Sequence, residues 1–374
     1  MNICLLVSSM EAGGAERVAA SLSNSWLAGG YRVILIVTYS HRGNCVYELD
    51  SGVELIYLAD QLAGQSSRFF GRFRRILALR KIIKIRKPDV VVSFLTNVNV
   101  SAIVAAFGLA VPVVVAEHSY PPKMPIVWWL DVLRNMTYPF ASAVVMLTTK
   151  GLQWLQAGFA SVKGVVIPNP AVFPLLGNHP FRQPHEHFPE DRKLVLSVGR
   201  LAPEKQVDHQ IRAFSSLVEA HPDWDLAIVG DGPLLAELTA LVENLHLSQR
   251  IKFTGRAGNV GDWYTRADLF VLSSLFEGFP NTLVEAMAHG CAVVSYDCDT
   301  GPRDIVRDGV DGLLVNPAAG AGGLAAAMGR LMDDTSQRRR LAEAAPSVRA
   351  RFGLPEVLDM WEALFLDVMG RRSR

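Results

Sequence analysis

Cysteine is scarce in this chain of 374 residues. Its four cysteines, Cys4, Cys45, Cys291 and Cys298, form no CxxC pair and have no spacing with histidines that would assemble a zinc site. The scarcity argues against a structural zinc site and against a disulfide framework. We expect reduced cysteines in a cytosolic protein.

An excess of charge of one sign is also lacking. The chain has 37 lysines and arginines against 36 aspartates and glutamates, so its net charge selects no partner, and we expect no nucleic acid. Residues 1–7 lack the basic segment, the apolar length and the cleavage site of a signal peptide. We expect them to form a first strand.

Charged residues are absent from residues 90–116, a stretch long enough to cross a bilayer. However, Asn97, Asn99, Gly108 and Pro112 divide it into an apolar run, a small-residue helix and a second β-branched run. This division favours two buried parallel strands around a helix over a transmembrane segment.

Apolar runs of strand length alternate with segments of helical period, which is the pattern of βα units. The first series of expected strands comprises residues 3–8, 32–38, 90–94, 113–117, 143–147 and 164–167. The second series comprises residues 194–198, 225–229, 251–254, 269–273, 292–296 and 312–315. The stretch between the two series is rich in proline and has no clean period, as is typical of a linker.

The chain is too long for one ordinary core, and its pattern predicts an α/β protein with two doubly wound, Rossmann-like domains. We expect an N-terminal domain in residues 1–167, completed by a C-terminal helix in residues 355–374. A linker in residues 168–192 would lead to a C-terminal domain in residues 193–354. Parallel sheets bind ligands at the carboxyl ends of their strands, so two such sheets suit a transfer between two substrates.

The first expected strand is followed by Gly13 and Gly14. Glycines at a strand-to-helix turn let backbone N–H groups approach a phosphate, and the helix N-terminus favours its negative charge. The turn lacks the full GxGxxG pattern, which disfavours a dinucleotide site. A plain tight turn is an equal alternative.

Acidic residues are absent between Asp60 and Asp89, where basic and apolar residues interleave. The basic residues that we assign to this predicted helix are Arg68, Arg72, Arg74, Arg75, Arg80, Lys81 and Lys84. Basic amphipathic helices lie on anionic membrane surfaces or hold diphosphate groups. A solvated basic face on a packed helix is the alternative, and both are left open.

Two further groups of residues lie at the ends of expected strands. Glu117, His118 and Ser119 end the fourth of these strands, where a histidine is either functional or structural. Arg200 and Lys205 share one strand-to-helix loop. Such a pair of cations can neutralise a diphosphate leaving group without a metal, although an ordinary surface loop would also contain them.

Residues 277–290, with the sequence EGFPNTLVEAMAHG, follow an expected strand and open a helix. Glu277 would lie in the loop, Asn281 or Thr282 would cap the helix, and Glu285 would lie in its first turns. The free N–H groups at this helix start can meet donor phosphates, while the two carboxylates meet sugar hydroxyls.

The sequence resembles glycosyltransferase family 4, which has the GT-B fold and a signature of two glutamates, here Glu277 and Glu285. The resemblance extends over nearly the whole chain. It includes Gly13-Gly14, Glu117-His118-Ser119, Gly199-Arg200 with Lys205, Gly230-Asp231-Gly232, Gly255-Arg256 and Gly301-Pro302-Arg303-Asp304-Ile305-Val306.

The resemblance implies roles for individual residues. Arg200 and Lys205 resemble the residues that bind the donor diphosphate. Glu285 resembles the glutamate that binds the ribose, and Glu277 resembles the residue beside the transferred sugar. His118 resembles a histidine that contacts that sugar. The other residues implied to bind the donor are Gly14, Gly199, Gly255, Arg256, Phe279, Pro280, Asn281 and Thr282. The family retains the anomeric configuration, and it implies transition-state electrostatics in place of a protein nucleophile.

Asp297-Cys298-Asp299 matches the DxD pattern of the unrelated GT-A transferases, where carboxylates hold a divalent metal. Its place late in the second series of strands indicates an accidental match. We therefore expect no metal and no cofactor.

Several segments look like those of bacterial N-acetylgalactosamine transferases that extend polyprenyl-diphosphate-linked oligosaccharides. They are Gly13-Gly14-Ala15-Glu16-Arg17, Ser93-Phe94-Leu95, Glu117-His118-Ser119, the basic segment and Tyr138-Pro139-Phe140. This likeness implies a UDP-sugar donor, a lipid-diphosphate-linked glycan acceptor and peripheral attachment to the inner face of the cytoplasmic membrane. A lipopolysaccharide or capsule acceptor, a nucleotide-sugar epimerase and a catalytically silent membrane-binding scaffold are the alternatives.

Overall fold

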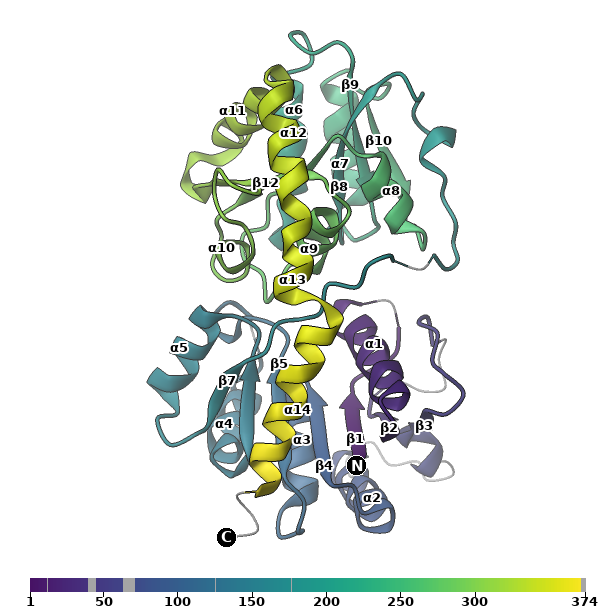
Figure 1. Cartoon of the computed structure of the whole chain (residues 1–374), viewed down its shortest axis with the longest axis vertical. Helices are drawn as coiled ribbons and strands as arrows, with labels where there is room; N and C mark the ends of the chain where they lie inside the picture. Colours follow the sequence, from purple (N-terminus) through teal and green to yellow (C-terminus); the bar gives the residue numbers. More distant parts are fainter. Residues whose placement is uncertain (12, 40–44, 63–70, 125, 176, 371–374) are drawn as a thin grey trace. The chain divides into compact units, whose positions relative to one another are not determined.

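The computed structural model describes the whole chain except residues 12, 40–44, 63–70, 125, 176 and 371–374. The chain divides into two compact units, residues 1–169 with 355–374 and residues 170–354. Each unit contains a parallel sheet covered by helices (Figure 1). All four cysteines are free, as predicted.

The sheet of the first unit has the strand order β3-β2-β1-β4-β5-β6-β7 in the described residues. The bounds are β1 (Asn2–Val7), β2 (Arg32–Val37), β3 (Glu54–Tyr57), β4 (Val90–Phe94), β5 (Val113–Glu117), β6 (Ala143–Met146) and β7 (Gly164–Val166). The sequence pattern predicts six of these strands but not β3, which is short, half-buried and at the sheet edge. The strand that ends at Glu117 is therefore the fifth, not the fourth.

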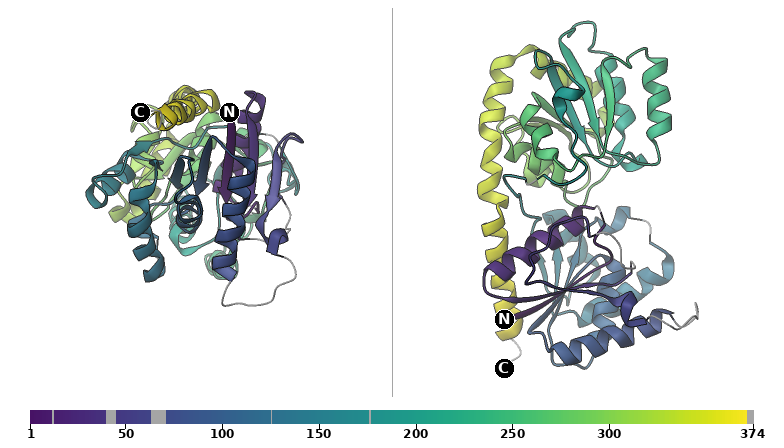
Figure 2. Two further views of the ribbon diagram at one scale, coloured as in Figure 1. Left: turned by 90° about the horizontal axis from the view of Figure 1, so that it is seen from below. Right: turned by 90° about the vertical axis from the view of Figure 1, so that its right-hand side faces the viewer.

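Helices cover both faces of this sheet. They are α1 (Gly14–Ala28), η1 (Leu58–Leu62), α2 (Gly71–Arg86), α3 (Thr96–Ala106), η2 (Pro121–Lys123), α4 (Trp128–Thr137), η3 (Tyr138–Phe140), α5 (Thr149–Gly158) and α14 (Leu354–Gly370). On one face α14 packs on α1, where the ring of Trp26 lies 5.5 Å from that of Phe365 and 6.0 Å from that of Trp361. On the opposite face α2 packs on α3 and α3 on α4 (Figure 2).

The uncharged stretch 90–116 forms β4, α3 and β5, as predicted. Both strands are fully buried, and most of α3 is buried as well. In the part of the chain that the structure describes, no helix is both long and apolar enough to span a membrane.

The second unit repeats the architecture with the strand order β10-β9-β8-β11-β12-β13 in its described residues. The bounds are β8 (Lys193–Val198), β9 (Trp224–Val229), β10 (Ile251–Gly255), β11 (Leu269–Leu272), β12 (Ala292–Tyr296) and β13 (Leu313–Val315). The helices are η4 (Pro184–Glu186), η5 (Pro203–Lys205), α6 (Val207–Ser215), α7 (Leu235–Asn244), α8 (Val260–Arg266), α9 (Asn281–Ala288), α10 (Pro302–Ile305), η6 (Pro317–Ala319), α11 (Gly320–Asp333), α12 (Thr335–Ala344), η7 (Ala345–Val348) and α13 (Arg349–Phe352). Two doubly wound α/β sheets are thus confirmed.

The proline-rich stretch expected as a linker makes specific contacts with the second unit. Residues 170–192 group with the second unit, and η4 packs on α8. The indole N–H of Trp263 donates to the carbonyl of Arg182 at 2.9 Å, and Asn259 exchanges hydrogen bonds with the Arg182 backbone. Irregular backbone that finds such partners is held in place, although its sequence has no helical or strand period.

Candidate functional site

The predicted donor-binding residues follow strands of the second unit. Because these strands are parallel, the loops after them emerge at one edge of the sheet. Gly199 and Arg200 follow β8, Gly255 ends β10, Arg256 follows it, and Glu277 lies between β11 and α9. Since β10, β9, β8 and β11 are neighbours, these loops lie side by side.

An ion pair joins two of these loops. Nζ of Lys205 lies 2.6 Å from Oε1 of Glu277, although the residues are 72 positions apart. The hydroxyl of Ser274 donates to the same Oε1 at 2.5 Å. Oε2 of Glu277 makes no hydrogen bond to the described residues, so it remains an acceptor for a sugar hydroxyl, beside a cation suited to phosphate.

Hydroxyl groups hold the backbone around this pair. The Ser273 hydroxyl donates to the carbonyls of Lys205 and Gln206, each at 2.8 Å. The Thr300 hydroxyl donates to the carbonyl of Glu277. These supporting hydroxyl groups were not predicted from the sequence. The sequence feature that could have indicated them is the pair of serines directly after a buried strand. Polar side chains at that place lie at the edge of a parallel sheet where ligands bind.

Two arginines at the same edge are exposed. Arg200 follows β8 and Arg256 follows β10. Neither guanidinium forms an ion pair with any described residue. Each is therefore available to an anionic ligand without first breaking a bond within the protein.

Glycines allow two of the loops to approach closely. A Cβ atom at Gly230 would lie 1.9 Å from the carbonyl oxygen of Gly199, and the φ of Gly230 is +148°. A Cβ atom at Gly232 would lie 2.4 Å from the carbonyl oxygen of Leu201. Only glycine fits either position. The two glycines of Gly230-Asp231-Gly232 thus have a structural role, because they let this loop pack closely against the loop that contains Arg200.

The start of α9 differs from the prediction. The helix begins at Asn281, its N-cap is Pro280, and no side chain among the described residues caps it. Asn281 and Thr282 are the first helical residues and not caps, since a cap requires extended backbone before the helix. Phe279 is buried and its ring lies 5.5 Å from that of Phe352, so only its backbone is open to a ligand.

Glu285 lies in the second turn of α9 and is buried. The Tyr264 hydroxyl, from α8, donates to its Oε2 at 3.0 Å. A buried carboxylate in a fixed position suits the two hydroxyls of a ribose. Tyr264 was missed because nothing in the sequence indicates which tyrosine reaches Glu285.

His118 follows β5 in the first unit, and its ring lies 4.0 Å from that of Phe94. Both ring nitrogens are buried and have no hydrogen-bond partner among the described residues. Burial lowers the pKa of His118 to about 3. The ring is therefore neutral at ordinary pH, and neither nitrogen is used in a hydrogen bond within the described residues.

Burial of a neutral His118 is expected to make the first unit less stable in acid. In the unfolded chain the imidazole takes up a proton below its ordinary pKa of 6.5, whereas in the fold it does so only near 3. Stability falls as the pH decreases between these values, by about 2 kcal/mol at about pH 5. We expect urea denaturation at about pH 5 and 7 to show a smaller loss of stability for His118→Phe than for the wild type. If the wild type and His118→Phe lose the same stability between these pH values, His118 is not held neutral by burial.

Glu117 points into the first unit and not toward a ligand. It is buried, and Thr96 donates to both of its carboxylate oxygens at 3.0 Å. The Tyr138 hydroxyl also donates to it. Burial raises the pKa of Glu117, and these hydrogen bonds oppose the rise. Glu117 therefore fixes β5 against α3 and η3, directly before His118.

The remaining predicted residues of the first unit lie on α1 and α2. Gly14 is exposed and begins α1. The basic residues Arg72, Arg74, Arg75, Arg80, Lys81 and Lys84 lie on α2, whereas Arg68 lies outside the described residues. The predicted helix therefore exists. Only two residues of this helix, Leu79 and Ile83, are buried. Its buried face is therefore narrower than is usual for an amphipathic helix.

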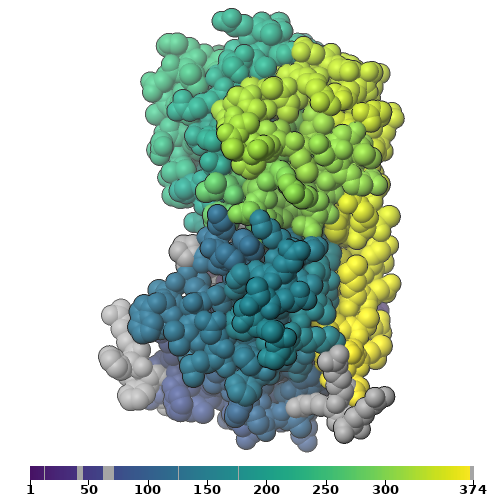
Figure 3. All heavy atoms as spheres, turned by 90° about the vertical axis from the view of Figure 1, so that its left-hand side faces the viewer, coloured from purple at the N-terminus to yellow at the C-terminus, as the bar shows by residue number. Residues whose placement is uncertain are grey.

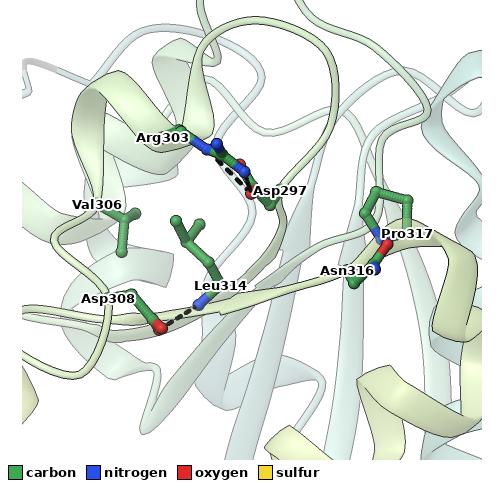
Figure 4. A pocket seen from close by; sticks show the side chains of 7 residues that line it. All are labelled: Asp297, Arg303, Val306, Asp308, Leu314, Asn316 and Pro317. Atoms are coloured by element: carbon green, nitrogen blue, oxygen red, sulfur yellow. Dashed lines mark hydrogen bonds and ion pairs between the residues drawn. The ribbon is translucent and has the colours of Figure 1, made fainter.

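The DxD-like aspartate Asp297 is engaged in an ion pair with Arg303 (Figure 4). Both residues line a pocket of about 630 Å³. The rest of its lining is Val306, Asp308, Leu314, Asn316 and Pro317 (Figure 4). None of these residues is a predicted donor residue. Across the described ranges, no group of three or more His, Cys, Asp and Glu side chains is placed to hold a metal ion.

Comparisons with known proteins agree with this architecture. A relative from Campylobacter jejuni is 29% identical over 373 residues, which is 98% of this chain and 99% of the relative. It is a GalNAc-alpha-(1->4)-GalNAc-alpha-(1->3)-diNAcBac-PP-undecaprenol alpha-1,4-N-acetyl-D-galactosaminyltransferase. An exopolysaccharide phosphotransferase of Streptomyces coelicolor is 37% identical over 236 residues, 63% of this chain. The match spans only 24% of that longer protein.

Among solved structures, Anabaena HepE in complex with UDP-glucose has a TM-score of 0.77 and 21% identity, over 97% of this chain and 99% of HepE. Family models cover both units. Residues 13–170 match the glycosyl transferase 4-like domain, and residues 180–348 match glycosyl transferases group 1. The chain therefore belongs to the glycosyltransferases of GT-B fold, with a family 4-like domain followed by a group 1 domain.

Proposed function

We propose that the chain transfers a hexose or N-acetylhexosamine, with GalNAc as the first candidate, from a UDP-sugar to a polyprenyl-diphosphate-linked glycan. The transfer would take place at the inner face of the cytoplasmic membrane. The observation that carries the proposal is the Lys205–Glu277 pair, with Arg200 on a neighbouring strand-to-helix loop. It puts two cations and a carboxylate at one sheet edge.

The residues of the second unit have separate parts in this reaction. Lys205 and Arg200 would stabilise the charge that develops on the diphosphate as the glycosidic bond breaks, a task that does not require a metal. Oε2 of Glu277 would orient the sugar through a hydroxyl group, and Glu285 would hold the ribose. With no protein nucleophile, the acceptor hydroxyl would attack on the face of the leaving group, so that the anomeric configuration is retained.

The relatives support the donor and acceptor classes. HepE was solved with UDP-glucose, and the Campylobacter relative is named for transfer of N-acetylgalactosamine to an undecaprenol-linked glycan. An Erwinia amylovora relative is named for amylovoran biosynthesis. We therefore place the acceptor among lipid-linked glycans and the chain among enzymes of polysaccharide or oligosaccharide assembly.

The test is nucleotide release by the purified protein, with UDP-, GDP- and ADP-sugars, with and without a short-chain polyprenyl-diphosphate glycan, and in EDTA. We expect acceptor-dependent UDP release that persists in EDTA and an α-linked product by NMR when the donor is α-linked. Inversion of the product or loss of activity in EDTA would refute the mechanism. If no donor supports release, calorimetry of UDP binding distinguishes a different acceptor from a silent fold.

A further inference from the structure

The outer face of α4 is apolar and exposed. Trp128, Val132 and Met136 are spaced four residues apart, and Phe140 follows in η3 with the same spacing. Their exposed fractions are 78%, 46%, 63% and 62%. Because residues four apart lie on one side of a helix, these side chains form one apolar strip. Strips of this kind on a folded unit mark interaction sites.

The outer face of α2 adds a second strip. Phe73, Leu77, Lys81 and Lys84 are spaced by four, four and three residues, and all four are exposed. Both helices pack on α3, and the Arg72 guanidinium lies 4.4 Å from the centre of the Trp129 ring, which joins α2 to α4. The strips therefore belong to the same helical layer of the first unit (Figure 2). Figure 3 shows the side of the molecule on which α4 and α5 lie.

The charge of this layer is positive and largely uncompensated. The α2 helix contains no acidic residue. Two of its arginines form hydrogen bonds or ion pairs within the protein: Arg80 donates to the carbonyls of Ala105 and Phe107, and Arg86 pairs with Glu54. Two more, Arg72 and Arg75, lie over the rings of Trp129 and Tyr39. Three others on this helix make no ion pair with any described residue, namely Arg74, Lys81 and Lys84. The only acidic residue of α4, Asp131, is paired with Arg134.

We propose that these residues form a docking face for an anionic lipid bilayer. The docking face consists of Phe73, Leu77, Trp128, Val132, Met136 and Phe140 with Arg74, Lys81 and Lys84. Tryptophan, phenylalanine and methionine enter the headgroup boundary, while the basic groups meet lipid phosphates. A second copy of the chain would place basic residues against basic residues. An acidic protein surface would pair with the basic residues but would leave the apolar strip exposed to water.

The inference deepens the proposed function, since a lipid-linked acceptor is presented at a membrane. It also changes the assignment of the basic helix. The basic segment alone was the membrane contact predicted from the sequence. The structure adds the apolar strip of α4, and it shows that Arg80 and Arg86 already have partners within the protein.

The experiment is co-sedimentation with vesicles that contain phosphatidylglycerol, compared with vesicles of phosphatidylcholine alone. The apolar variant carries Trp128→Ser, Met136→Ser and Phe140→Ser, and the basic variant carries Arg74→Gln, Lys81→Gln and Lys84→Gln. The control carries Val310→Ser and Leu366→Ser, which are also exposed but lie outside the docking face. We expect the wild type and the control to bind anionic vesicles, more weakly in high salt, and each variant to lose at least about 10-fold in affinity.

Wild-type affinity in both variants would overturn the docking face. So would a dimer of the wild type, seen by light scattering, that the apolar variant abolishes without a change in vesicle binding. Thermal melts check folding, and Trp128→Ser alone, at the most exposed position, is the variant to use if the triple change unfolds the protein. The assay contains no donor and no acceptor, so vesicle binding by a protein that neither releases nucleotide nor binds UDP would refute the proposed function and leave the docking face standing.

Discussion

Replacing both Arg200 and Lys205 by alanine is expected to reduce turnover by at least about 10³-fold, because each cation stabilises charge that grows on the leaving diphosphate. The two residues differ in their structural roles. Arg200 is exposed and makes no ion pair with the described residues, so Arg200→Ala alone should lose about 10²-fold in kcat and keep the melting temperature. Lys205 is paired with Glu277, so its removal should also lower the melting temperature.

Steady-state kinetics with a saturating donor and a thermal melt of each variant measure these effects together. Arg339→Ala is the matched control, since Arg339 is an exposed arginine of α12, a helix that contributes no predicted site residue. It should change neither quantity. Full activity in the double variant would remove the donor assignment of both residues, whatever happens to stability.

Gly230→Ala is expected to destabilise the second unit strongly. Its Cβ atom would overlap the carbonyl oxygen of Gly199, and the φ of +148° is unfavourable for alanine. Since the clashing oxygen belongs to the backbone of Gly199, the β8 loop must move. We expect a loss of about 2–3 kcal/mol in the free energy of unfolding, with weaker UDP binding because the shifted loop contains Arg200.

The control for this substitution is Gly322→Ala. Gly322 is exposed near the start of α11, and a Cβ atom there meets nothing within 4 Å. Alanine should be neutral or stabilising there by up to about 1 kcal/mol, because it favours a helix. Urea denaturation and calorimetry of UDP binding measure both variants. If Gly230→Ala is as stable as the wild type, the two loops are not in close contact.

Much of the fold could be predicted because burial imposes a pattern on parallel strands. Apolar runs such as residues 90–94 and 292–296 could be assigned as strands, since both faces of a parallel sheet are covered. The edge strand β3 was not predicted, because its four residues are half-buried and do not form an apolar run of this kind. The contacts of the proline-rich stretch could not be predicted either, since its irregular backbone is held by partners distant in sequence, such as Trp263.

The sequence by itself determined the two doubly wound sheets, the loops that carry Arg200, Lys205, Glu277 and Glu285, and the family. Local pattern is sufficient for these features, because strand period and turn residues are encoded within short segments. Only the tertiary structure decided that Lys205 pairs with Glu277, that Tyr264 holds Glu285, and that the outer face of α4 is left uncovered. Such contacts depend on how segments far apart in the chain pack together, which no local period specifies.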